Sequence, residues 1–506
     1  MKQSTKKIFL SIAVLGLSFA LGSCHWAPST SSSSMIIIAV DQLGVNEVNC
    51  DPQSPTQARS GIALICQESV RFTHAYTTSP LSGPALTSVL TGQYPFQHGL
   101  RSNSKSFLPG RVNTLTEVVQ KRGYATSFFS GGAPILRKLN LQQGFETFDD
   151  AFTPTPQKLF KPFAESQEAF KTWLREIRSQ NFFSVFYVPD LAFTQTVTVS
   201  DLGQTRNLSF ESQFEEFDES LYSFIQDLKS RNLWDSTLLV LVGLNGPDRG
   251  ERSVELPNTN LFSERVQVGL LIKPSQKPRD QGLNWSYDGN LTLADLGVTF
   301  FEPFEPIHLK DLDFPVHSLQ TVLKSPFSEK KNPPERFILT ESAWMEDQPI
   351  RYSLRWGQYL FILDEKPQIF NSLIDRFETS SLKTHETSVR DLWSKIESIR
   401  QKKQWLLWPE PLYEKVLKWQ GLAAGKLTSW ERLAHRLKDD MEINNLYSRE
   451  LLALQNWENL ERWAQGMKFK DLEKIAHKNL KKENRQKFED PCLATLDLPH
   501  PKSSDL

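Results

Sequence analysis

The chain has 506 residues, of which 39% are hydrophobic and 23% are charged, and its formal net charge at pH 7 is −1. This composition is typical of a globular protein and excludes an intrinsically disordered chain. The length suits roughly two or three structural units with a sizeable core. Because the charge is near zero and no basic run is dense, we expect no nucleic-acid partner.

Residues 1–24 have the pattern of a targeting segment. Three lysines precede the apolar run Ile8 to Ala20, which is well short of the roughly 20 residues that a membrane-spanning helix needs. Leu21-Gly22-Ser23-Cys24 matches the bacterial lipobox, in which the cysteine is lipidated. We therefore expect a lipoprotein signal peptide, with a lipid on Cys24 as the membrane anchor. An ordinary secretory signal or a short anchor helix is the alternative. His25, in place of an aspartate, favours the outer membrane of a bacterial cell envelope.

A polar, serine-rich tether is expected over residues 25–34. Cys50, Cys66 and Cys492 are the cysteines that follow it, and their spacing is not that of a zinc site. An oxidising periplasm would permit a Cys50–Cys66 disulfide, and two inert buried thiols are the alternative.

Three continuous apolar runs are typical of strands that are covered on both faces. They are Met35 to Val40, Phe182 to Val188 and Leu238 to Val242, and amphipathic stretches at Thr114–Arg122 and Phe214–Ser230 lie between them. This alternation predicts an α/β fold with a mostly parallel sheet flanked by helices. Ligands bind beyond the carboxyl ends of such strands, where the runs are followed by polar residues.

The pattern changes near residue 336. Short strands are predicted at Phe337 to Thr340, Ile350 to Trp356 and Tyr359 to Leu363, so residues 336–380 are expected to form a small C-terminal α+β subdomain. Residues 381–506 are predicted to be a helical extension, because apolar residues recur there at intervals of three and four. These are Ala453, Trp457, Leu460, Ala464 and Met467. This extension could dock a partner protein of the envelope.

Residues 82–86 read Ser82-Gly83-Pro84-Ala85-Leu86, and Thr91-Gly92-Gln93-Tyr94-Pro95 follows shortly after them. This loop, together with further landmarks in the same order, resembles the sulfatase family. The resemblance covers about residues 35–380 and implies the alkaline-phosphatase-like fold, with a main domain over 35–335. In the family, position 82 is a Cys or Ser that is oxidised to formylglycine, the group that attacks the sulfate ester. The family also has a Pro at position 84 and an Arg at position 86, where this chain has Leu86.

The family's calcium site is also altered in this chain. The resemblance maps the first calcium ligand to Asp41, but the second aspartate is replaced by Gln42. A later Asp-Asn pair is replaced by Leu244-Asn245. We therefore expect a weak calcium site or none, and Asp41 and Asn245 are alternatively plain turn residues.

The histidine that aids leaving-group departure in the family is missing after Phe182–Val188. His98 is expected to brace a turn. For Ser82, three roles are open: a formylglycine precursor, a direct nucleophile and a helix cap, of which the cap is favoured.

Two functions remain. The first is a sulfatase-like, membrane-anchored lipoprotein without efficient sulfuric ester hydrolysis, which binds sulfated or phosphorylated glycans or acts as a scaffold. The second is an active sulfuric or phosphoric ester hydrolase with a rebuilt metal site, to which Asp248, Arg249 and Glu251 could contribute. The combined losses at positions 42, 86 and 244 favour the first.

Overall fold

The structure is a computed structural model. It describes residues 33–51, 59–103, 107–155, 158–179, 181–192, 197–199, 204–206, 209–247, 260–275, 285–305, 316–324, 336–342, 351–363, 368–382, 457–466 and 470–485. Several sequence predictions lie outside these residues, namely those for the signal peptide, most of the tether, Cys24, Cys492, and the charged group Asp248, Arg249 and Glu251.

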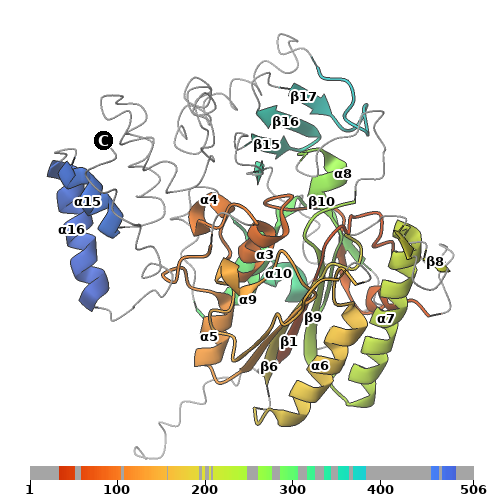
Figure 1. The fold of residues 1–506 in the computed structure, drawn as a ribbon. Coiled ribbons are helices and arrows are strands. Elements are labelled where there is room, and N and C mark those ends of the chain that lie inside the picture. The colour runs from red at the N-terminus through yellow and green to blue at the C-terminus, as the bar shows by residue number, and fades with distance from the viewer. Residues whose placement is uncertain are drawn as a thin grey trace, which may run out of the picture. The chain divides into compact units, whose positions relative to one another are not determined.

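An eight-stranded, mostly parallel sheet forms the centre of the fold (Figure 1). Its order is β12 (Trp285–Tyr287), β2 (Val70–Phe72), β11 (Leu270–Lys273), β9 (Thr237–Gly243), β1 (Ser34–Val40), β6 (Phe182–Val188), β4 (Ala125–Ser130) and β5 (Thr147–Asp149). Only β11 runs antiparallel to its two neighbours. The three apolar runs are therefore confirmed as the adjacent central strands β9, β1 and β6.

β1 begins one residue earlier than predicted, at Ser34, so the tether cannot extend to that residue. Ser34 pairs with Thr237 in the parallel ladder, and its Oγ accepts a hydrogen bond from the Phe182 backbone N–H at 3.2 Å. Its side chain is buried because it satisfies a backbone donor at the start of the neighbouring strand.

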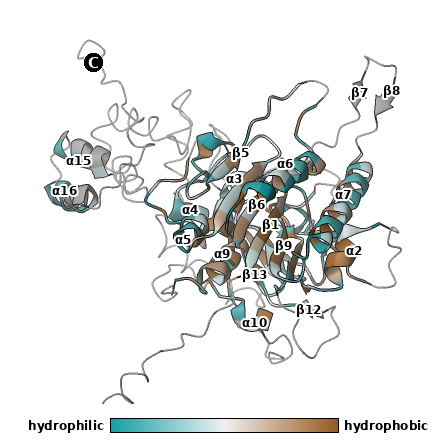
Figure 2. Ribbon diagram, turned by 90° about the horizontal axis from the view of Figure 1, so that it is seen from below, coloured by the Kyte–Doolittle hydropathy of each residue, from teal (hydrophilic) through white to brown (hydrophobic). Residues whose placement is uncertain are grey.

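Successive side chains of β1 enter two different cores, as the alternation of a strand dictates. Met35, Ile37 and Ala39 pack in one core, with the helices α3 (Ser82–Thr91), α5 (Leu115–Lys121) and α9 (Leu293–Phe301). Ile36, Ile38 and Val40 pack in the other, with α2 (Gly61–Cys66), α6 (Phe163–Glu176) and α7 (Phe210–Ser230). Figures 1 and 2 show the strands between these helices, with hydrophobic residues along them.

Helices α3 and α9 approach each other closely through two glycines. Gly92 ends α3 in a left-handed conformation with φ 68°. A Cβ at Gly297 would lie 2.3 Å from the Gly92 nitrogen and 2.5 Å from its Cα, which no real side chain tolerates. The absence of a side chain at Gly297 therefore sets how closely α3 approaches α9.

A four-stranded antiparallel sheet makes up the described part of the C-terminal subdomain. It consists of β14 (Ile338–Ser342), β15 (Arg351–Trp356), β16 (Tyr359–Leu363) and β17 (Gln368–Asn371). The three strands predicted here are found, and β17 is an additional strand. Arg101 joins this sheet to the main domain, because its guanidinium donates to both Glu341 carboxylate oxygens, at 2.8 and 3.0 Å, and to the Tyr352 hydroxyl at 2.9 Å.

Several further elements of residues 59–324 are short. They are the three-stranded sheet β10 (Gln267–Val268), β3 (Ala75–Tyr76) and β13 (Leu291–Thr292), the pair β7 (Val197–Val199) and β8 (Gln204–Arg206), the helices α4 (Pro95–His98), α8 (Ser263–Val266) and α10 (Gln320–Lys324), and a 3-10 turn at Arg137–Leu139.

The open question of the cysteines is answered in favour of the disulfide. Cys50 and Cys66 are bonded, with their Cα atoms 5.4 Å apart. The bond ties the loop after β1 to the last residue of α2.

Two helices are found in the predicted helical extension, α15 (Trp457–Gly466) and α16 (Lys470–Arg485). Leu460 and Ala464, two residues of the predicted apolar stripe, are buried. Over the described parts of the chain, every helix is too short or too polar to cross a membrane.

Candidate active site

Three polar residues meet at the carboxyl ends of the central strands. Asp41 follows β1, Asn245 lies two residues after β9, and Tyr187 is the second-last residue of β6. β1 lies between β9 and β6, so the ends of the three strands are adjacent. The first turn of α3 brings Ser82 to the same place. The parallel topology therefore assembles the site where such sheets carry their ligands.

The Asp41 carboxylate is the centre of a hydrogen-bond network. Its Oδ2 accepts from the Ser82 hydroxyl at 2.8 Å and from the Tyr187 hydroxyl at 2.6 Å. Its Oδ1 accepts from the Asn245 side-chain amide at 3.3 Å. Only 5% of Asp41 is exposed, so these bonds replace the water that the carboxylate loses on folding. We refer to Asp41, Ser82, Tyr187 and Asn245 as the Asp41 network.

Burial raises the pKa of Asp41 above its ordinary value, while the hydrogen bonds from Tyr187, Ser82 and Asn245 oppose this rise, as does the nearby charge of Arg265. Burial and the Asp41 charge together hold the pKa of Tyr187 well above 10, so its hydroxyl remains a donor.

Ser82 does not cap its helix, and the favoured role from the sequence is wrong. α3 begins at Ser82 itself, its cap residue is Leu81, and no side chain caps the helix. As the first helical residue, Ser82 lies one position past the cap, and its hydroxyl donates a hydrogen bond to Asp41 at 2.8 Å.

The N-terminus of α3 has few donors left for an anionic ester. The Gly83 N–H donates to the Asn103 side-chain oxygen at 2.8 Å, and Pro84 has no N–H. Pro84 lies in the first turn of α3, where a missing N–H costs no intrahelical bond. An ester oxygen at this helix end would have to displace Asn103 or rely on the remaining backbone groups.

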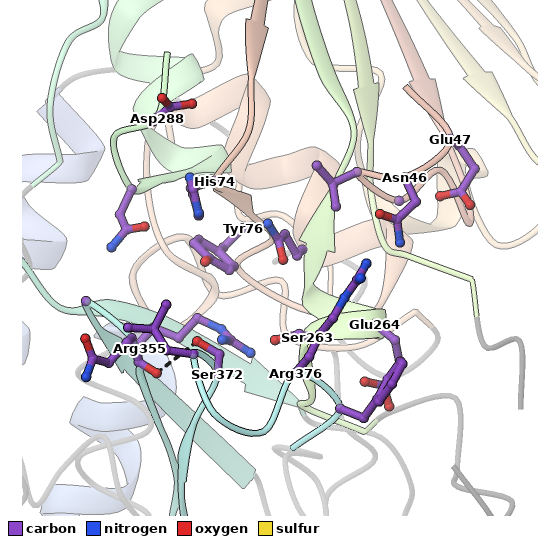
Figure 3. A pocket seen from close by; sticks show the side chains of 18 of the residues that line it. Asn46, Glu47, His74, Tyr76, Ser263, Glu264, Asp288, Arg355, Ser372 and Arg376 are labelled. Atoms are coloured by element: carbon purple, nitrogen blue, oxygen red, sulfur yellow. Dashed lines mark hydrogen bonds between the residues drawn. The ribbon is translucent and has the colours of Figure 1, made fainter. Parts of the chain in front are cut away.

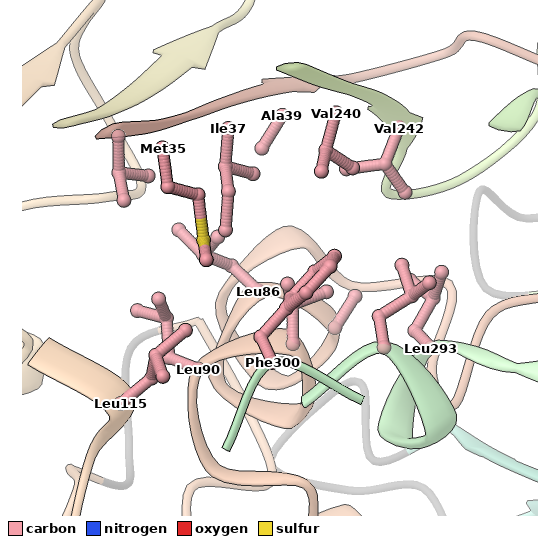
Figure 4. Close-up of a cluster of buried hydrophobic side chains, with 14 of the residues drawn as sticks. Met35, Ile37, Ala39, Leu86, Leu90, Leu115, Val240, Val242, Leu293 and Phe300 are labelled. Carbon is pink, nitrogen blue, oxygen red and sulfur yellow. The ribbon is translucent and has the colours of Figure 1, made fainter. Parts of the chain in front are cut away.

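Leu86 points away from the Asp41 network into the core. It is 0% exposed, and Figure 4 shows it among Met35 and Ile37 of β1 and Phe300 of α9. The position where the sulfatase pattern has an arginine is therefore an apolar packing site in this protein.

The side-chain amides of Gln42 and Asn245, at the positions of the expected calcium site, also form hydrogen bonds. The Asn245 oxygen accepts from the Gln42 backbone N–H at 3.0 Å, and the Gln42 side-chain amide donates to the Ala192 carbonyl at 3.2 Å. Gln42 adopts a left-handed backbone with φ 58°.

These residues do not fit a calcium ion. Calcium takes six to eight oxygen ligands, several of them usually carboxylates. The Asp41 network has one carboxylate, and both of its oxygens already accept hydrogen bonds. Among the residues that the structure describes, no group of three or more His, Cys, Asp or Glu side chains is placed to hold a metal ion.

His98 braces a turn, as predicted. It is fully buried, its Nδ1 accepts from the Leu100 N–H at 3.2 Å, and its Nε2 lies 3.2 Å from the Ser88 hydroxyl. Burial lowers its pKa to about 3, so the ring is neutral.

Sequence reasoning missed three residues around Ser82 and Asp41. Tyr187 was read as part of an apolar strand, and Asn103 lies in a loop without a motif. The third is Arg265, a buried arginine that donates to the Gly246 carbonyl at 2.7 Å. The only signal for Tyr187 was a hydroxyl near the end of a buried strand.

The chain is similar to known proteins in sequence and in fold. An N-acetylglucosamine-6-O-sulfatase of Bacteroides thetaiotaomicron is 27% identical over 133 residues, which are 25% of this chain and 22% of that protein. The match thus spans less than a quarter of that relative.

Two solved structures have a similar fold. A putative sulfatase from Bacteroides thetaiotaomicron has a TM-score of 0.58 and 17% identity over 73% of this chain and 92% of its own. A phosphonate monoester hydrolase of Agrobacterium radiobacter has a TM-score of 0.54 and 15% identity over 73% of this chain and 96% of its own.

The sulfatase family model matches residues 33–302, just over half of the 506 residues. That range contains every residue of the Asp41 network and the helices on both faces of the sheet. The chain is therefore a member of the sulfatase family.

Proposed function

We propose that this sulfatase-family protein lacks efficient sulfuric ester hydrolysis and serves as a binding or scaffold protein of the bacterial cell envelope, held there by a lipid on Cys24. The observation that carries the proposal is the closed Asp41 network. Its single carboxylate accepts three hydrogen bonds, which leaves about one of its four acceptor positions for a metal ion that needs six to eight oxygen ligands.

Two further observations support the proposal. Leu86 lies in the core, so no arginine from that position reaches an ester. The Ser82 hydroxyl donates its hydrogen bond to Asp41, and we expect Ser82 to stay unmodified. Removing charge stabilisation of this kind costs an enzyme on the order of 10²-fold or more in rate for each group lost.

The envelope location has independent support from the Cys50–Cys66 disulfide, since such bonds persist in oxidising compartments. In this proposal the ligands are sulfated or phosphorylated glycans, and residues 381–506 contact an envelope protein. Replacing Cys24 with alanine tests the anchor. The variant should move from the membrane to the soluble fraction, and an unchanged membrane fraction would contradict lipidation at Cys24.

A hydrolase remains the second candidate because of one observation. The Asp41 carboxylate accepts a hydrogen bond from the Ser82 hydroxyl, with 2.8 Å between the oxygens, and its pKa is raised, which is the arrangement of a general base next to a nucleophilic hydroxyl.

One set of measurements separates the two candidates. Protein lacking residues 1–24 is assayed with aryl sulfate and aryl phosphate esters, with and without calcium, beside Ser82→Ala and the matched control Ser88→Ala. We expect no turnover above background, no bound calcium, and an unmodified Ser82 by mass spectrometry. Turnover that is lost in Ser82→Ala but kept in Ser88→Ala would establish the hydrolase instead.

A further inference from the structure

A cavity of about 510 Å³ lies beside the C-terminal sheet (Figure 3). Its wall comes from the loop after β1, from β3, α8 and β10, and from the C-terminal sheet with the turn that follows β17. Asp41, Ser82, Tyr187 and Asn245 do not line it. Its volume lies within the range of small-molecule sites, about 300–1,000 Å³.

The wall is rich in groups that both donate and accept hydrogen bonds. Side-chain amides line it at Asn46, Asn290, Gln267 and Gln358, beside the ring of His74. Burial lowers the pKa of His74, so at neutral pH the ring is uncharged, with one donor and one acceptor nitrogen. Such a wall matches a ligand with many hydroxyl groups.

The charges of the wall disfavour an anionic ligand. The cation of Arg355 is already neutralised, because its two terminal nitrogens each donate to the buried Glu378 carboxylate at 3.1 Å. The same guanidinium lies 5.0 Å from the centre of the Tyr76 ring. Of the other charged lining residues, Arg376 is a cation, and three are carboxylates, namely Glu47, Glu264 and Asp288. Counted by formal charge, the lining has two cations and three carboxylates, so a sulfate or phosphate group in the cavity would gain no net attraction from it.

The turn after β17 adds apolar surface to the wall. Leu373 is 75% exposed and Phe377 is 48% exposed, and both line the cavity. Ile374, 77% exposed, lies beside them in the sequence. Exposed apolar side chains grouped next to a polar cavity are typical of ligand sites. Sugar rings combine hydroxyl edges with apolar C–H faces, which pack on aromatic rings such as that of Phe377.

We propose that this cavity is a binding site for an uncharged carbohydrate, a mono- or disaccharide unit whose hydroxyls bond to the amides and carboxylates while a ring face packs on Phe377 and Leu373. The proposal goes beyond the proposed function, because it concerns a different site and holds whether or not Ser82 has an activity.

The test is calorimetric titration of the full chain with a panel of uncharged sugars. The panel contains glucose, galactose, mannose, N-acetylglucosamine, N-acetylgalactosamine and their disaccharides, each beside its 6-O-sulfated form. At least one uncharged sugar should bind, and its sulfated form should bind at least tenfold more weakly. Asp288→Asn should reduce that discrimination several-fold, because it removes one repelling charge, whereas the exposed control Asp235→Asn should not.

Phe377→Ser should weaken binding of the uncharged sugar about tenfold without lowering the melting temperature. Leu159→Ser is the matched control, since Leu159 is 41% exposed and does not line the cavity. The proposal is overturned if no uncharged sugar binds at millimolar concentration, if the sulfated forms bind more tightly, or if Phe377→Ser binds like the control. None of these results depends on catalysis at Ser82, so they are independent of the hydrolysis assays.

Discussion

Asp190 should make the stability of the protein fall as the pH rises through neutrality. Its side chain is buried at the end of β6, where Oδ1 accepts from the Phe163 N–H at 3.0 Å at the start of α6. Its other oxygen, Oδ2, is buried and has no hydrogen-bond partner among the residues that the structure describes. Burial raises the pKa of Asp190 from 3.8 to about 7.

The direction of this change in stability follows from proton binding. Between pH 4 and pH 7 the folded protein holds a proton on Asp190 that the unfolded chain has lost, so stability decreases with rising pH. The full difference of about three pH units corresponds to about 4 kcal/mol, of which about 3 kcal/mol falls between pH 5 and pH 8.

Asp190→Asn removes the ionisation and keeps an oxygen for the Phe163 N–H. The free energy of unfolding is measured in urea at pH 5 and pH 8 for the wild type, Asp190→Asn and the exposed control Asp235→Asn. Relative to the wild type, Asp190→Asn should gain about 3 kcal/mol on going from pH 5 to pH 8. The reasoning fails if the wild type and Asp190→Asn change in parallel with pH.

Three further predictions concern the core, the junction of the sheets and the disulfide. Leu86→Arg should destabilise the protein by more than about 3 kcal/mol, because it buries an unpaired charge, and it should not create calcium binding. Thermal unfolding with and without calcium checks both outcomes. Leu86→Met, which should cost under about 1.5 kcal/mol, is the control. Arg101→Met should cost about 3–5 kcal/mol by leaving the buried Glu341 carboxylate unpaired, and adding Glu341→Gln should recover part of that loss in urea unfolding. Cys50→Ser should lower the unfolding free energy by about 2–4 kcal/mol, and a reductant should then destabilise only the wild type; equal sensitivity to reductant would contradict the bond.

The sheet could be predicted because strands that are covered on both faces have unbroken apolar sequences. The predicted Phe182 to Val188 is β6 to the residue, and Leu238 to Val242 is β9 without its terminal residues. Short strands such as β3 and β13 could not be found in this way, because two residues carry no periodicity.

The meeting of Asp41, Ser82 and Asn245 followed from the topology and the family pattern, but their bonding did not. The prediction had the Ser82 oxygen accept a hydrogen bond from its own helix, whereas the Ser82 hydroxyl donates one to the nearby Asp41 carboxylate. The polar role of Tyr187 could not be predicted, because its ring belongs to the apolar face of β6, together with Phe183 and Val185. Its hydroxyl reaches Asp41 because Tyr187 is the second-last residue of β6, next to the end of β1.

The close approach of α3 and α9 at Gly297 makes the geometry of Ser82 depend on a residue remote from it in the sequence. α3 carries Ser82 at one end and meets Gly297 at the other, where Gly92 terminates the helix. A single added methyl group at Gly297 would have to push the whole helix aside, because both contacting atoms are backbone. The 2.8 Å bond between Ser82 and Asp41 would then lengthen, although every residue of the Asp41 network is unchanged. Substitutions at Gly297 should therefore alter the hydrogen bonding of the Asp41 network from a distance.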